Sequence, residues 1–130
     1  MWVDNYIQIP FQCDGRTRET GVDCYGLLRL VYSERLHIEL PDYAGIFVDQ
    51  SFETLKKVAK VMEEGFLTWD EVVDSPKPFD MIILRSGKYQ WHVGLVTNKV
   101  YMLHIMSGID SCVEEYNGLY WKKRVVGFRR

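Results

Sequence analysis

Two stretches in the first half of the chain carry apolar residues at helical spacing. They run from Asp23 to about Leu36 and from Ser51 to about Glu64, with charged residues on the opposite side of each stretch. Asp23 and Ser51 are residues of the kind that cap helix N-termini, and Gly65 is placed to end the second helix. The apolar positions are Leu27, Leu28, Val31 and Leu36 in the first stretch and Phe52, Leu55, Val58, Ala59 and Met62 in the second. We therefore expect two amphipathic helices.

The second half of the chain has the pattern of β-strands. Runs rich in β-branched and aromatic residues follow the break at 75–78, which contains two prolines. The expected strands are 79–84, 91–96, 100–106, 112–114 and 124–128. Helices followed by antiparallel strands predict an α+β fold in which the N-terminal helices pack on the sheet. We expect residues 1–22 to form an irregular arm and a loop, and residues 1–130 to form a single domain.

Charge and hydropathy disfavour two classes of interaction. Sixteen basic and eighteen acidic residues give a formal net charge of −2, and no basic stripe of the kind that binds nucleic acid is present in the sequence. No apolar run approaches the roughly 20 residues of a membrane-spanning helix, and residues 1–5 do not begin a secretion signal. We expect no nucleic-acid partner, no membrane span and no export signal.

Three cysteines are present, and one of them occupies a position suited to chemistry. Cys13, Cys24 and Cys112 form neither a CxxC pair nor a cluster at metal-ligand spacing, so neither a disulfide framework nor a zinc ribbon is expected. Cys24 lies in the first turn of the first predicted helix, where unpaired N–H groups and the helix dipole favour an anion. We expect the pKa of its thiol to fall below the free value of about 8.5 and Cys24 to act as a nucleophile. The alternative is a small core residue, because Cys24 shares a face with the apolar positions of that helix.

A predicted hairpin brings two histidines together. The strand-like segments 91–96 and 100–105 are joined by three polar residues centred on Asn98, a length typical of hairpin connections. In the register centred on Asn98, His92 lies directly opposite His104 on one face of the sheet, with Cβ atoms about 5 Å apart. A register slip of one residue would instead place the two histidines on opposite faces.

Two adjacent imidazoles suit a cysteine nucleophile. His92 would accept the thiol proton of Cys24, and His104 would fix the tautomer and orientation of His92. Two other interpretations remain open. Both histidines can be hydrogen-bonded sheet residues without chemistry, or the three side chains can bind a metal whose fourth ligand is water.

Four short motifs occur in the order and spacing of a known family. They are Gly-Val-Asp-Cys-Tyr-Gly-Leu at 21–27, Ile-Glu-Leu-Pro at 38–41, His-Val-Gly at 92–94 and Met-Leu-His at 102–104. With these motifs the chain resembles the NlpC/P60 family of papain-like cysteine peptidases, and more narrowly the phage tail members of that family. The resemblance covers nearly the whole chain from Pro10 onward.

The resemblance implies a catalytic triad and a substrate. Cys24, His92 and His104 would cleave the stem peptide of bacterial peptidoglycan, typically between γ-D-glutamate and a diamino acid, through a papain-like fold. Amides of the first helical turn would stabilise the oxyanion. The resemblance implies no metal and no cofactor.

The resemblance also indicates substrate-binding residues. Asp23 and Tyr25 would contact the substrate and Trp91 would line the cleft, although Asp23 fits the role of a helix cap equally well. Many bacterial members have serine where this chain has Tyr25, which favours an uncut wall peptide over a peptide with a free amine. Phe11 stands where the family has a tyrosine. The hydroxyl of that tyrosine is therefore missing here, unless the hydroxyl of Tyr25 or Tyr6 takes its place.

The narrower likeness implies a location. A phage or phage-like tail, assembled in the host cytoplasm, would bring the enzyme to the cell wall and would make other tail proteins its partners. Two rival functions remain: a Cys-His amidase or acyltransferase, and a tail assembly or plug protein that uses the fold structurally.

Overall fold

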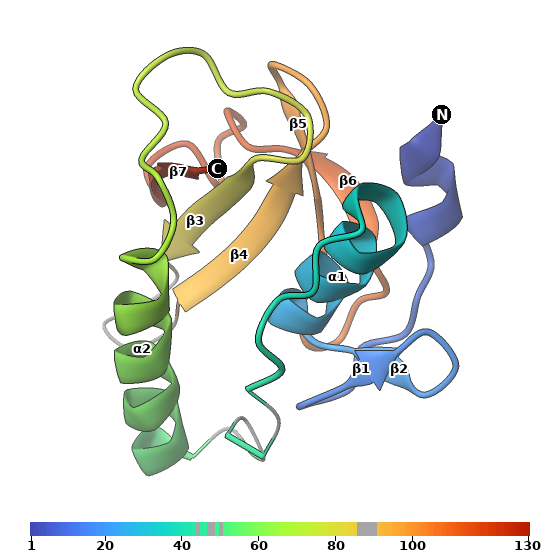
Figure 1. Cartoon of the computed structure of the whole chain (residues 1–130), viewed down its shortest axis with the longest axis vertical. Coiled ribbons are helices and arrows are strands. Elements are labelled where there is room, and N and C mark those ends of the chain that lie inside the picture. The colour runs from blue at the N-terminus through green and yellow to red at the C-terminus, as the bar shows by residue number, and fades with distance from the viewer. Residues whose placement is uncertain (44, 47–48, 50, 86–90) are drawn as a thin grey trace.

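A computed structural model describes residues 1–43, 45–46, 49, 51–85 and 91–130. It confirms the α+β class, with two α-helices beside an antiparallel sheet (Figure 1). The strands lie in the order β6-β5-β4-β3-β7. Their bounds are β3 (Met81–Arg85), β4 (Trp91–Val96), β5 (Tyr101–His104), β6 (Cys112–Glu115) and β7 (Val125–Arg129).

The N-terminal segment is more regular than the sequence predicts. A 3₁₀ helix, η1 (Trp2–Tyr6), is followed by a small hairpin of β1 (Arg16–Thr17) and β2 (Gly21–Val22). The expectation of an irregular arm and a loop is therefore wrong for these residues. Strands of two residues are too short to show a periodic apolar pattern, so the sequence carries no signal for them.

Helix α1 (Cys24–Val31) begins at the predicted position, and its α-helical part ends at Val31. Asp23 caps it, because its side chain accepts a hydrogen bond of 2.7 Å from the N–H of Gly26. The chain then continues into a π-helical turn, η2 (Tyr32–Leu36), and leaves it at His37 in the left-handed conformation with φ 56°. The helical conformation therefore extends to Leu36 as predicted, but its last five residues form a π-helix.

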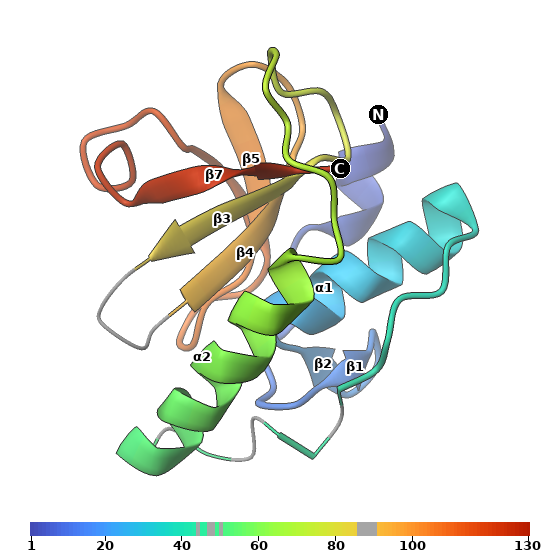
Figure 2. The same cartoon turned by 60° about the vertical axis from the view of Figure 1, so that its left-hand side comes forward.

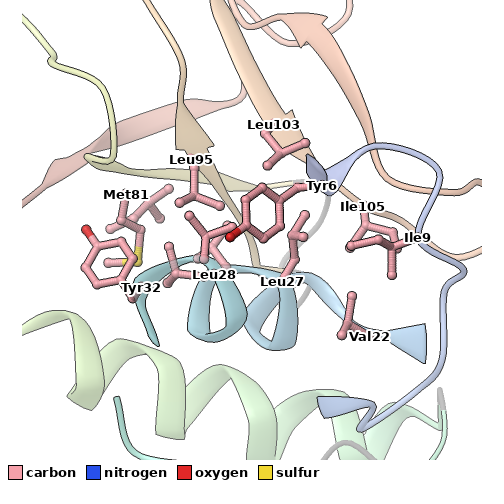
Figure 3. Close-up of a cluster of buried hydrophobic side chains, with 13 residues drawn as sticks. Tyr6, Ile9, Val22, Leu27, Leu28, Tyr32, Met81, Leu95, Leu103 and Ile105 are labelled. Atoms are coloured by element: carbon pink, nitrogen blue, oxygen red, sulfur yellow. The ribbon is translucent and has the colours of Figure 1, made fainter. Parts of the chain in front are cut away.

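Helix α1 packs its apolar side against the sheet. Leu27, Leu28 and Val31 are fully buried, and Figure 3 shows Leu27 and Leu28 beneath side chains from β3, β4 and β5. The sheet residues of this cluster are Met81, Ile83, Val93, Leu95 and Leu103. A second cluster contains Ile82, Leu84, Val96 and Met102, which alternate with the first set along the strands and so occupy the other face. Trp121 covers that face.

Helix α2 (Phe52–Phe66) stands beside the start of β4 in both views (Figures 1 and 2). Ser51 caps it as predicted, accepting a hydrogen bond of 3.2 Å from the N–H of Thr54. The expectation that Gly65 ends the helix is wrong, since the helix continues to Phe66. Among the described residues, no helix is long and apolar enough to cross a membrane.

Candidate active site

The hairpin that carries the two histidines has a register two residues away from the predicted one. Leu95 pairs with Leu103 and Val96 with Met102, so the direct opposition of His92 and His104 is wrong. The side chain of Asn98 causes the difference, because its Oδ1 accepts hydrogen bonds from the backbone N–H groups of Val100 and Tyr101, at 2.8 and 2.9 Å. This turn lengthens the connection.

A shift of two residues keeps the histidines on one face. Continued toward the strand ends, the observed pairing places Gly94 opposite His104, and a Cβ at Gly94 would come within 3.2 Å of the His104 Cβ. His92 is therefore the diagonal neighbour of His104, a separation that long side chains bridge. The rings meet, with His92 Nε2 2.9 Å from His104 Nδ1.

One of the two histidines is hydrogen-bonded to a carboxylate that the sequence analysis did not predict to be part of the site. His104 Nε2 lies 2.6 Å from Oε2 of Glu114 in β6. A carboxylate accepts, so His104 Nε2 donates; neutral His104 then accepts at Nδ1, and His92 donates from Nε2. The Nδ1 atom of His92 is left without a proton, which is the state a general base requires.

Burial keeps both histidines neutral. His92 is 6% exposed and His104 is fully buried. Burial, and secondarily the charge of His104, lowers the pKa of His92 to about 3. Burial also lowers the pKa of His104, although the hydrogen bond and charge of Glu114 act in the opposite direction. Trp121 holds the pair from the side, since its ring stacks on His92 and meets His104 edge-on, each at 5.5 Å between centroids.

Cys24 opens onto a cavity of about 420 Å³ that His92 also lines. Within the described part of the chain, no hydrogen bond joins the Cys24 sulfur to the His92 ring. The sulfur interacts instead with the backbone N–H groups of Val93, the residue after His92, and of Tyr25. Cys24 and His92 therefore line the same cavity, and His104 is hydrogen-bonded to His92.

The expectation of a lowered thiol pKa is wrong for this structure. Burial, followed by the negative charge of Asp23, raises the pKa of Cys24 to about 12. Hydrogen bonds from the backbone N–H groups of Val93 and Tyr25 lower the thiol pKa, which is the direction expected for a helix N-terminus. The loss of solvation raises the pKa by more than these bonds lower it. At neutral pH the resting thiol is protonated, and attack requires proton transfer to a base.

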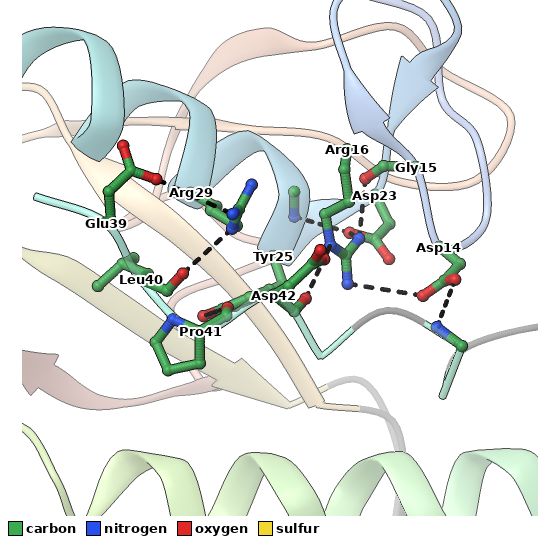
Figure 4. A network of polar contacts seen from close by, with 12 residues as sticks. Asp14, Gly15, Arg16, Asp23, Tyr25, Arg29, Glu39, Leu40, Pro41 and Asp42 are labelled. Carbon is green, nitrogen blue, oxygen red and sulfur yellow. Dashed lines mark hydrogen bonds and ion pairs between the residues drawn. The ribbon is translucent and has the colours of Figure 1, made fainter.

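Asp23 is the centre of a polar network shown in Figure 4. Its Oδ1 accepts from the capped helix and from Arg16 Nη1 at 2.9 Å, and the residue is only 2% exposed. Arg16 also lies 3.2 Å from a carboxylate oxygen of Asp42 and 3.6 Å from one of Asp14. Burial raises the pKa of Asp23, against the charge of Arg16. The capping role of Asp23 is therefore present in the structure.

The other predicted contacts line the same cavity. Tyr25 and Trp91 are among its walls, together with Phe11 and the inner side of α2. The hydroxyl of Tyr25 donates to the carbonyl of Pro41 at 2.5 Å. Trp91 donates from its indole nitrogen to Glu63 of α2 at 3.0 Å. Tyr25 is thus bonded to Pro41, another residue of the cavity wall, and Trp91 is bonded to helix α2.

The other two cysteines do not share this position. Cys112 lies 3.8 Å from His104 Nε2, but that nitrogen is the one bonded to Glu114, and neither Cys112 nor Cys13 is among the described residues that line the cavity. Cys24 is therefore the thiol that a substrate in the cavity would meet.

Three residues of the site escaped the sequence analysis. Arg16, Glu114 and Trp121 reach it from segments with no motif of their own. Glu114 was accessible in principle, because it belongs to the predicted strand at 112–114, which a sheet can place beside the strand of His104. Arg16 and Trp121 depend on short irregular segments that periodicity does not describe.

The model of the NlpC/P60 family matches residues 8–130. The chain belongs to the NlpC/P60 family. This result supports the enzyme class expected from the motifs at 21–27 and 92–94.

Individual relatives are distant. The chain is 25% identical, over 130 residues, to the gamma-DL-glutamyl hydrolase of Bacillus subtilis (strain 168), and it spans 27% of that protein's length.

Two solved structures have similar folds. A protein of Staphylococcus aureus described as similar to a lipoprotein of the NLP/P60 family has a TM-score of 0.66 and 22% identity, with 97% of this chain and 37% of that chain covered. The NlpC/p60 domain of the peptidoglycan hydrolase SagA has a TM-score of 0.61 and 16% identity, with 98% and 90% covered.

Proposed function

We propose that this chain is a peptidoglycan endopeptidase that hydrolyses the bond between γ-D-glutamate and a diamino acid in stem peptides. One observation carries the proposal: a hydrogen-bonded chain runs from Glu114 through His104 to His92, and His92 lines the same cavity as Cys24. Family membership supports the reaction class, and the name of the Bacillus subtilis relative supports a γ-glutamyl bond.

The first half of the reaction forms a thioester. His92 Nδ1 takes the proton of the Cys24 thiol as the sulfur attacks the carbonyl carbon of the substrate. His92 becomes an imidazolium, and His104, held by Glu114, accepts its Nε2–H throughout. The carbonyl oxygen becomes an oxyanion, and the backbone N–H of Cys24 at the start of α1 is proposed to donate to it.

The second half releases the products. The tetrahedral intermediate collapses, the carbon–nitrogen bond breaks, and His92 gives its proton to the leaving amine. A water molecule, deprotonated by His92, then attacks the thioester, and the acid leaves as the Cys24 thiol regains a proton. No step requires a metal or a cofactor.

Three residues are proposed to contact the substrate. Tyr25 and Trp91 offer apolar ring surfaces on the cavity wall. The Asp23 carboxylate is already bonded to Arg16, which reduces its capacity to bind a free peptide amine. This pairing, with Tyr25 in place of the serine of many members, favours an uncut wall peptide as substrate.

The site is further proposed to act from a phage or phage-like tail, among other tail proteins. The Asp-Cys-Tyr-Gly form of the nucleophile motif and the segment at 6–11 support this placement. Mass spectrometry of purified particles would test it. Peptides of this chain in intact particles are expected, and their absence from particles of a producing strain would overturn the placement.

The reaction is tested with defined substrates. Purified protein is incubated with stem peptides and with intact muropeptides, and products are identified by mass. Cleavage after γ-D-glutamate supports the proposal. Release of the sugar lactyl group from alanine would indicate an amidase, and a product joined to an added amine would indicate an acyltransferase.

A further inference from the structure

Three metal-binding groups of different kinds meet at the far end of the histidine chain. Nε2 of His104, the sulfur of Cys112 and a carboxylate oxygen of Glu114 all lie within 4.8 Å of one another. Cys112 is paired directly opposite His104 across strands β5 and β6, and Glu114 is two residues further along β6. Residues two apart in a strand point to the same face, so the three side chains form a triangle on one face of the sheet.

We propose that this triangle is an inhibitory binding site for Zn²⁺. The inference rests on the proposed function, since it concerns the same histidine. Tetrahedral zinc with nitrogen, sulfur and oxygen ligands needs donor atoms roughly 3.5 Å apart. His104 Nε2 lies 3.8 Å from Cys112 and 2.6 Å from Glu114, so the Glu114 carboxylate has to retreat by roughly 1 Å.

The site has an entrance and a place for a fourth ligand. The Glu114 side chain is 46% exposed and Cys112 is half-buried, whereas His104 is completely buried. A cation therefore approaches from the solvent side through Glu114, and water completes the coordination. Zinc suits this donor set better than Mg²⁺ or Ca²⁺, because a thiolate and an imidazole are softer ligands than the oxygens that those ions select.

Zinc at this position would reverse the tautomers of both histidines. With the metal on Nε2, His104 carries its remaining proton on Nδ1 and donates it to His92 Nε2 across the 2.9 Å contact. His92 then holds its own proton on Nδ1, where the proton of Cys24 has to arrive. The proton lost from His104 Nε2 is balanced by one gained at His92 Nδ1, and the Cys112 thiol releases one proton to solvent. The base is blocked without any contact between metal and substrate.

Binding is tested first, independently of activity. In a Cys24→Ser background, which removes the nucleophilic thiol as a competing ligand, calorimetry with ZnCl₂ should give one site per chain. Co²⁺ should show thiolate-to-metal charge-transfer absorption. Adding Cys112→Ser should weaken binding by at least about 100-fold and abolish the absorption, whereas adding Cys13→Ser should change neither. Unchanged binding in the Cys24→Ser/Cys112→Ser variant, or no binding at all, would overturn the site.

Inhibition is tested second, on protein with Cys24 intact. Zinc should suppress peptide cleavage, a chelator should restore it, and Cys112→Ser should cleave normally but resist zinc. Equal inhibition of the Cys112→Ser variant would overturn the regulatory role. A chain that binds zinc through Cys112 but cleaves no stem peptide under any condition would refute the proposed function and leave the metal site standing.

Discussion

At the scale of single residues, the site combines a half-buried thiol with a buried base. Cys24 and His92 are both neutral at rest, because burial raises the pKa of the thiol to about 12 and lowers the pKa of the imidazole to about 3. A resting thiolate–imidazolium pair is therefore disfavoured. The nucleophile is generated during attack, by proton transfer to His92.

This state predicts how Cys24 reacts with an alkylating reagent. A group with a raised pKa ionises only as the pH approaches that pKa, so the rate at Cys24 should rise continuously from pH 6 to pH 10. Peptide mapping after timed iodoacetamide treatment measures it, with Cys13 as the internal reference. A rate plateau across the acidic and neutral range would contradict the account by revealing a preformed ion pair.

The triad itself predicts graded losses. Cys24→Ala and His92→Ala remove the nucleophile and the base and should each lower kcat by at least about 10⁴-fold, whereas His104→Ala should leave measurable cleavage, because an orienting group contributes less. The readout is kcat on a defined stem peptide. Similar residual activity in all three variants would be incompatible with these roles.

Glu114 should act through His104. Glu114→Leu removes the acceptor of the His104 Nε2–H and should lower kcat by roughly 10- to 100-fold with little change in KM, the equivalent of one charge-assisted hydrogen bond. Glu114→Gln keeps an acceptor oxygen and should recover part of the loss. The neighbouring exposed Glu115→Gln is the matched control and should behave as the native chain. An unchanged kcat in Glu114→Leu would remove Glu114 from the mechanism.

At the scale of elements, the β4–β5 hairpin positions the base. Gly94 is essential to it, because a Cβ there would lie 3.0 Å from the carbonyl oxygen of Leu103 and 3.2 Å from the Cβ of His104. The Cβ of His104 and the backbone of Leu103 therefore occupy space that a side chain at position 94 would need.

Substitution at this glycine should damage both stability and activity. Gly94→Ala is expected to cost about 1–3 kcal/mol of unfolding free energy through overpacking and to displace His104. Gly127→Ala in β7 has nothing within 4 Å of its added Cβ and should change stability by less than about 0.5 kcal/mol. Urea unfolding and kcat measure the two effects. Equal stability of the two variants would contradict the packing argument.

The elements also show what the sequence could and could not predict. The strand at 91–96 and the cap at Asp23 follow from alternation and helix-start chemistry, and the structure has both. The hairpin register does not follow, since the hydrogen bonds of Asn98 lengthen the turn by an amount that composition does not determine. The predicted pairing of the two histidines is nevertheless found, because the register differs by two residues and a shift of two keeps each side chain on the same face of the sheet.

At the scale of the whole molecule, the site is assembled from segments that are distant in the chain. α1 supplies Cys24 on one face of the sheet, and the opposite face holds His104 beside Trp121. Apolar periodicity predicts both faces of the sheet. It does not predict polar contacts such as those of Glu114 with His104 and of Arg16 with Asp23, because polar contacts between distant segments leave no periodic signal.

The central claim is that Cys24, and no other thiol, attacks the substrate. Acid-quenched reactions with a defined stem peptide, followed by intact-mass analysis and peptide mapping, test it directly. The account predicts an acyl adduct on the peptide that contains Cys24, with the mass of the fragment ending in γ-D-glutamate, and no adduct in the Cys24→Ser variant. An adduct on Cys112 or Cys13, or equal product formation by Cys24→Ser, would contradict it.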